Sequence, residues 1–129
     1  MKVGLLRAVG AGTALYGLGV ARWPGLLARS SGLADEQGRT AEATRASLRP
    51  LALREVASGL ALCLAPKGPA LGTAAALRLA ADLGDAALLG RTLPTRRHRR
   101  AAVAVSVAWA SLTTAALLLP ATPARGGTA

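Results

Sequence analysis

The sequence feature that most constrains the fold is an uncharged run at residues 101–120, AAVAVSVAWASLTTAALLLP. A helix rises about 1.5 Å per residue, so a run of this length covers the roughly 30 Å hydrocarbon core of a bilayer. A helix on the surface of a soluble domain needs a polar face, and this run offers only serine and threonine hydroxyls. The run therefore predicts a transmembrane helix.

Three further apolar segments precede this run, at about residues 3–23, 51–65 and 70–90. Composition favours helices for all of them, because the chain has 31 alanines and 24 leucines but no phenylalanine or isoleucine. The segment at 51–65 is short for a span and needs an extension through ASLRP or a local thinning of the bilayer. With the fourth helix at about 101–119, the 129 residues predict a single all-α domain, a four-helix transmembrane bundle.

The charges between these segments are distributed unevenly, and the asymmetry predicts an orientation. Ten arginines lie in or beside the connections at 24–50 and 91–100, whereas the connection APKGP has only Lys67. Positively charged loops are retained in the cytoplasm, so both arginine-rich loops are expected there and both termini outside. The stretch DEQGRTAEATRA in the first loop is polar enough for a short helix on the cytoplasmic surface.

The first segment and the second loop each have an alternative interpretation. Lys2 before an apolar run, with Gly19 and Ala21 near its end, is typical of a cleaved signal peptide. Arg7 interrupts this run, and cleavage would place the five-arginine loop outside, so an uncleaved span is favoured. The sequence RRHRR at 96–100 is typical of nucleic-acid binding, but no aromatic residue is interleaved. It therefore predicts an anchor for the fourth helix, without a nucleic-acid partner.

Several classes of site are excluded by what the chain lacks. Cys63 is the only cysteine and His98 the only histidine, which rules out an intramolecular disulfide, a multi-cysteine metal site and a histidine-based metal cluster. The glycine-rich stretch VGAGTALYGLG follows no strand, so it predicts a helix-packing surface and not a nucleotide-binding loop. We expect no metal and no cofactor, and the lipid bilayer as the main partner.

Five charged residues inside the apolar segments form the candidate site: Arg54, Glu55, Arg78, Asp82 and Asp85. The last three are spaced i, i+4 and i+7, which places them on one face of a helix. Charges at membrane depth are costly, so they are expected to pair with one another. We call these five residues the charged cluster.

The short APKGP connection makes the second and third segments antiparallel neighbours. If their cytoplasmic ends are level, Arg54 lies within a turn of Asp85, and Arg78 sits deeper, near Cys63, one turn from Asp82. Two pairs then form, and only Glu55 is left to find a partner or a proton. The charged cluster is either a lock that holds two helices in register or a working site. In a working site the arginines grip an anionic or carbonyl group and the carboxylates exchange protons.

The motifs RAVGAGTALYGLGVARWP, RPLALREVASGLAL and ADLGDAALLG, followed by a basic loop and a last apolar helix, resemble small four-helix bacterial membrane proteins of the DoxX-like kind. The resemblance covers roughly residues 4–119. It implies a multi-pass protein of the bacterial inner (plasma) membrane and transfers no catalytic role to any residue. The expected role is a non-enzymatic membrane component that acts through a membrane-protein partner or as a homo-oligomer. The alternatives are a membrane-embedded enzyme or proton-coupled carrier that uses the charged cluster, and a basic soluble binding module.

Overall fold

The structure, a computed structural model, describes residues 1–120, and every regular element within them is an α-helix. The all-α prediction is confirmed. The five helices are α1 (Val3–Arg22), α2 (Pro24–Ser30), α3 (Glu42–Leu64), α4 (Pro69–Thr92) and α5 (Arg96–Leu118). Four of them correspond to the four predicted segments. The short helix α2 was not predicted, because Pro24 was interpreted only as the end of α1, whereas proline is also well suited to the first turn of a new helix.

The loops are shorter than predicted at both places where the sequence is basic. Helix α3 begins at Glu42 and continues through Pro50, so the predicted loop at 24–50 contains α2 and the first two turns of α3. Helix α5 includes all of RRHRR, and its N-cap Thr95 accepts a hydrogen bond through Oγ1 from the backbone N of His98 at 3.3 Å. The predicted boundaries followed the loss of hydropathy, but glutamate and arginine favour helices although they are charged.

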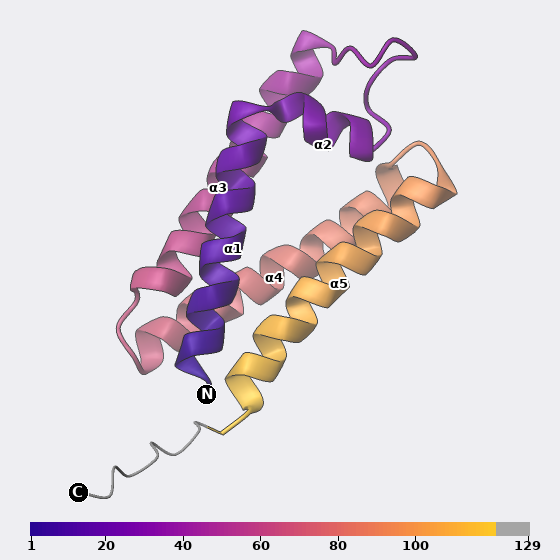
Figure 1. Ribbon diagram of the computed structural model, residues 1–129. Helices are drawn as coiled ribbons and strands as arrows, with labels where there is room; N and C mark the ends of the chain where they lie inside the picture. Colours follow the sequence, from indigo (N-terminus) through magenta and orange to yellow (C-terminus); the bar gives the residue numbers. More distant parts are fainter. Residues whose placement is uncertain (121–129) are drawn as a thin grey trace, which may run out of the picture.

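The four long helices alternate in direction along the chain (Figure 1). The N-terminus, the turn at 65–68 and the end of α5 lie at one end of the molecule, which we call the turn end. There the backbone N of Lys2 donates to the carbonyl oxygen of Ala116 at 2.6 Å. Helix α2 and the α4–α5 connection lie at the opposite end (Figure 1), which carries ten arginines and which we call the basic end.

The long helices form two closely packed pairs that spread apart towards the basic end (Figure 1). Helix α1 packs along α3, and α4 packs along α5, whereas contacts between the pairs are much fewer. Helices α3 and α4 are antiparallel as predicted, but neither is the other's main packing partner. Sequence adjacency alone suggested otherwise, because a tight turn brings helix ends together without determining the angle between the helices.

Glycines explain why α1 and α3 are the closer pair. A Cβ atom added at Gly59 of α3 would lie 2.5 Å from the backbone N of Ala14 and 2.6 Å from the carbonyl oxygen of Gly10. A Cβ at Gly17 of α1 would lie 2.9 Å from the Cβ of Glu55. The predicted packing surface of VGAGTALYGLG is thus an α1–α3 contact in which the two backbones touch. This contact also positions the α3 turn that carries Glu55.

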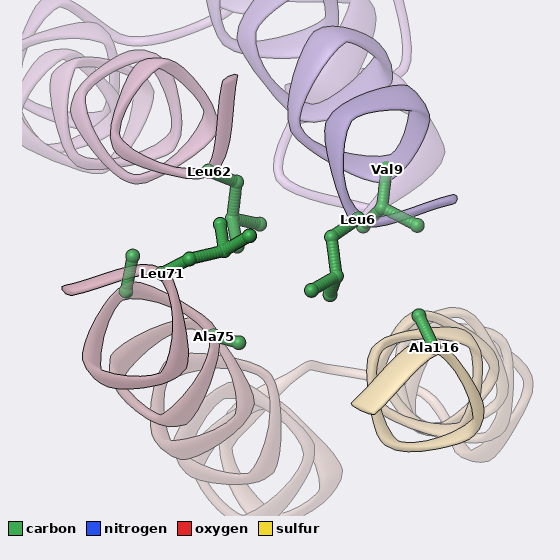
Figure 2. Close-up of a cluster of buried hydrophobic side chains, with 7 residues drawn as sticks. Leu6, Val9, Leu62, Leu71, Ala75 and Ala116 are labelled. Atoms are coloured by element: carbon green, nitrogen blue, oxygen red, sulfur yellow. The ribbon is translucent and has the colours of Figure 1, made fainter. Parts of the chain in front are cut away.

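The hydrophobic core lies at the turn end, where all four long helices meet (Figure 2). In Figure 2 the side chains of Leu62 and Leu71, from α3 and α4, point towards each other, and Leu6 of α1 points into the space between the helices. The cluster has seven buried members: Leu6, Val9, Leu62, Leu71, Ala74, Ala75 and Ala116. Val20, Leu48 and Leu93 are buried outside this cluster. The cluster itself does not extend along the α3–α4 interface, whose middle is held by other interactions.

Candidate functional site

One face of α3 and one face of α4 change from apolar to charged along their length. The buried residues of α4 are Leu71, Ala74, Ala75, Arg78 and Asp82, which follow the i, i+3, i+4, i+7 pattern of a helix face. On α3 the buried face runs from Leu62 through Gly59 to Glu55. Both faces are apolar near the turn end and become charged at Glu55 and Arg78, so the charged cluster lies directly beyond the apolar cluster of the turn end. On α3 the buried face is apolar again at Ala52 and Leu48.

Arg78 is the centre of the charged cluster. Its Nη1 donates to Oε2 of Glu55 at 2.6 Å, across the α3–α4 interface. Its Nε donates to Oδ2 of Asp82 at 3.2 Å, and its Nη2 donates to Oδ1 of the same carboxylate. Two parallel N–H···O bonds to one carboxylate are the strong bidentate arrangement of arginine. Arg78 therefore holds one carboxylate on its own helix and one on the neighbouring helix.

Arg54 makes the second link between the two helices. Its Nη2 donates to Oδ2 of Asp85 at 2.5 Å and to Oε1 of Glu55 at 3.0 Å. The predicted proximity of Arg54 to Asp85 is confirmed. Because Glu55 accepts from Arg54 through one oxygen and from Arg78 through the other, the two pairs are joined into one network of five side chains.

Two details of the predicted pairing are wrong. Arg78 does not lie level with Cys63: it is nine residues from the start of α4, opposite Glu55, which is nine residues from the end of α3. Glu55 is therefore not left without a partner. The prediction assumed that the cytoplasmic ends of the two helices lie at the same depth. In the structure the turn at 65–68 sets the register, and the two helices diverge from this turn.

Ser58 belongs to the network but was not predicted as a site residue. Its Oγ accepts from Nη1 of Arg78 at 3.2 Å and donates to the carbonyl oxygen of Glu55 at 3.3 Å. The sequence signal was its position one turn after Arg54 and Glu55, on the same face of α3. Serines are common in apolar helices, so this spacing alone did not identify Ser58 as a member of the network.

Burial divides the charged cluster into an inner and an outer part. The side chains of Glu55, Arg78 and Asp82 are 6%, 4% and 2% exposed, whereas those of Arg54 and Asp85 are 40% and 19% exposed. Within residues 1–120, Nε of Arg54 is the only buried side-chain nitrogen or oxygen without a hydrogen-bond partner. The inner part is thus saturated by its own hydrogen bonds, and the outer part is open on one side.

The remaining candidate residues have structural contacts. Cys63 donates through Sγ to the carbonyl oxygen of Arg7 at 3.4 Å, and His98 lies beside Gly32, at the basic end. Among residues 1–120, no three histidine, cysteine, aspartate or glutamate side chains are placed to hold a metal ion. One open cavity is lined by the connection at 32–41 and another by α2 with the adjoining ends of α1 and α3, and no residue of the charged cluster lines either of them.

Two of the described helices, α1 and α5, are long and apolar enough to cross a membrane. Helices α3 and α4 do not reach this hydropathy, and both carry residues of the charged cluster. Comparison of the chain with protein families, with curated proteins and with solved structures gives no match.

Proposed function

We propose that the protein is an integral membrane component that crosses the bilayer four times, through α1, α3, α4 and α5. The observation that carries this proposal is the apolar character of the exposed surface. Among residues 1–120, seventeen large hydrophobic residues are exposed, including Leu77 at 67%, Val105 at 66% and Leu53 at 65%. In the most apolar part of α5 only 17% of the residues are buried. A soluble monomer rarely exposes apolar surface on this scale, but lipid covers it without cost.

The arrangement of the charged cluster explains how α3 and α4 can cross the bilayer beside α1 and α5. Their five charged side chains face one another, while leucines occupy the outer faces: Leu53, Leu60, Leu77, Leu83 and Leu88 are all exposed. Intramembrane charges are tolerated where they are paired in the interior of a bundle. The low hydropathy of α3 and α4 is therefore compatible with their crossing the bilayer.

The basic end supports an orientation with that end in the cytoplasm. Ten arginines lie there, against Lys2, Arg7 and Lys67 towards the turn end, among the described residues. By the positive-inside rule, the proposed location is an inner or plasma membrane, with the chain's termini outside the cytoplasm. The resemblance to DoxX-like proteins implies a four-helix integral membrane bundle, in agreement with four spans.

We propose that the charged cluster is a lock, and that the protein is a non-enzymatic component that acts through a membrane-protein partner or as an oligomer. All three carboxylates accept hydrogen bonds from an arginine. Arg54 links α3 to Asp85 of α4, and Arg78 links α4 to Glu55 of α3 and also binds Asp82 on its own helix. Arg78 commits Nε, Nη1 and Nη2 to Asp82, Glu55 and Ser58, which leaves it few donors for a substrate. The lock replaces the hydrophobic core in the part of the interface where the helices diverge.

One observation favours a second function, that of a proton-coupled carrier. The charged cluster has three carboxylates and two arginines, so it carries one formal negative charge in excess, and Asp85 is 19% exposed. In a bilayer this excess requires a proton or a cation. Proteoliposomes with a trapped pH-sensitive dye distinguish the two functions. The lock predicts no proton flux above that of empty vesicles, and a flux that disappears in Asp85→Asn would establish the carrier.

Val105→Lys tests whether the exposed apolar surface faces lipid. A lysine at the centre of a spanning helix costs about 2.5–3.5 kcal/mol by insertion scales, whereas an exposed surface substitution in water changes stability by about 0.5 kcal/mol or less. We expect Val105→Lys to reduce the amount of protein that stays in the membrane pellet after alkaline extraction.

The matched control is Gln37→Lys, which adds the same charge on an exposed loop at the basic end. It is expected to leave membrane retention unchanged. Release of the unsubstituted protein by alkali, or equal retention of Val105→Lys and Gln37→Lys, would contradict the proposed membrane insertion.

A further inference from the structure

A groove at the basic end combines arginines with exposed apolar side chains. It has a volume of about 830 Å³ and lies where α1 ends, α2 begins and α3 starts its first turns. Four arginines line it, Arg22, Arg29, Arg45 and Arg49, and no aspartate or glutamate does. We call it the arginine groove.

The arginines of the groove have no ionic partners. None of the four forms a salt bridge within residues 1–120, although Glu42 is only three residues from Arg45 and Asp35 pairs with Arg39 nearby. Arg29 donates from Nε to the carbonyl oxygen of Gly38 at 3.3 Å, which leaves its other donors available. Four like charges around one concavity repel each other, and a bound anion relieves this repulsion.

Apolar side chains adjoin these charges. Trp23 lines the groove and is 57% exposed, and the guanidinium carbon of Arg22 lies 5.3 Å from the centre of its ring. Leu26 also lines the groove and is 61% exposed. Tryptophan is typical of the interface between membrane and water, where an apolar ring and a polar edge are both accommodated. The groove thus offers guanidinium groups for an anion and apolar surface for a hydrocarbon chain.

We propose that the arginine groove binds the headgroup phosphate of an anionic phospholipid of the cytoplasmic leaflet. The guanidinium groups hold the phosphate oxygens by paired, charge-assisted hydrogen bonds, and the acyl chains run along Leu26 and the exposed end of α1. Basic pockets beside spanning helices on the cytoplasmic side are suited to such headgroups. The inference rests on the proposed membrane insertion and adds a specific lipid contact to it.

Tryptophan fluorescence of the full-length protein in a nonionic detergent tests this site. The protein is titrated with dihexanoyl phosphatidylglycerol, with dihexanoyl phosphatidylcholine and with inorganic phosphate. We expect saturable binding of phosphatidylglycerol, and about tenfold or greater weakening in Arg45→Gln/Arg49→Gln, because two charge-assisted contacts are lost. Both arginines are exposed, so thermal unfolding should be unchanged in this variant.

The matched control is Arg96→Gln/Arg97→Gln, which removes the same charge from the same end outside the groove. It should bind phosphatidylglycerol like the unsubstituted protein. Equal weakening in both double variants, equal binding of phosphatidylcholine, or no saturable response would overturn the proposal. Inorganic phosphate binding as tightly as phosphatidylglycerol would identify a free-phosphate site instead of a lipid site. Failure of the membrane proposal is separate, because it is observed as release by alkali before purification.

Discussion

Arg78→Met is expected to lower the free energy of unfolding by about 3–5 kcal/mol, since it leaves buried carboxylates without a counter-charge. Glu55 and Asp82 are 6% and 2% exposed, and Arg78 supplies the bidentate contact of Asp82 and the shortest contact of Glu55. The measurement is chemical unfolding of the purified protein in detergent. Arg54→Met is the matched control and should cost less, because the side chain of Arg54 is 40% exposed.

A triple variant tests whether the inner part of the charged cluster is a replaceable lock. In Arg78→Met/Glu55→Met/Asp82→Leu the inner charges are removed together, and the Arg54–Asp85 pair remains neutral as a whole. Apolar groups of similar volume commonly replace a buried ion network without loss, so the triple variant should recover most of the stability lost in Arg78→Met. If it is as unstable as the single variant, the network is not a replaceable lock and this part of the proposal is wrong.

Gly59→Ala is expected to destabilise the protein by about 1–3 kcal/mol, the usual cost of overpacking. The added Cβ would lie 2.5 Å from a backbone nitrogen and 2.6 Å from a backbone oxygen of α1, neither of which is the end of a flexible side chain. Helices α1 and α3 must therefore separate. Thermal unfolding in detergent measures the effect.

Gly72→Ala is the control, because nothing lies within 4 Å of a Cβ at Gly72 on α4. There alanine removes the helix penalty of glycine and should stabilise the protein by up to about 1 kcal/mol. A destabilisation by Gly72→Ala as large as that by Gly59→Ala would show that the loss does not depend on the α1–α3 contact.

The pairing in the charged cluster was predictable only in part. The i, i+4 spacing on α4 determines that Arg78 meets Asp82, because both residues lie on one helix. The tight turn brought α3 and α4 close enough to predict Arg54 beside Asp85. The bridging role of Glu55 depends on the register between α3 and α4, which the turn at 65–68 sets and which the spacing within either helix does not encode.

The pairing of the helices and the arginine groove were beyond sequence reasoning for a different reason. The glycines of α1 indicated a packing surface, but the matching Gly59 is a single residue among many small ones in α3. The groove depends on α2, which turns the chain sideways after Trp23 and brings Arg29 near Arg45. Arginines separated by a loop were interpreted only as positive charge, because their convergence is a tertiary property.

Labelling of two introduced cysteines with a membrane-impermeant maleimide tests the proposed topology most directly. Cys63 is the only cysteine, so Cys63→Ala provides a background without thiols. Lys67→Cys lies in the exposed turn between α3 and α4, and Arg97→Cys lies at the exposed basic end. In intact spheroplasts we predict labelling of Lys67→Cys alone, with Arg97→Cys labelled only after permeabilisation. Labelling of Arg97→Cys in intact spheroplasts, or of neither cysteine before permeabilisation, would contradict a four-span protein with its basic end in the cytoplasm.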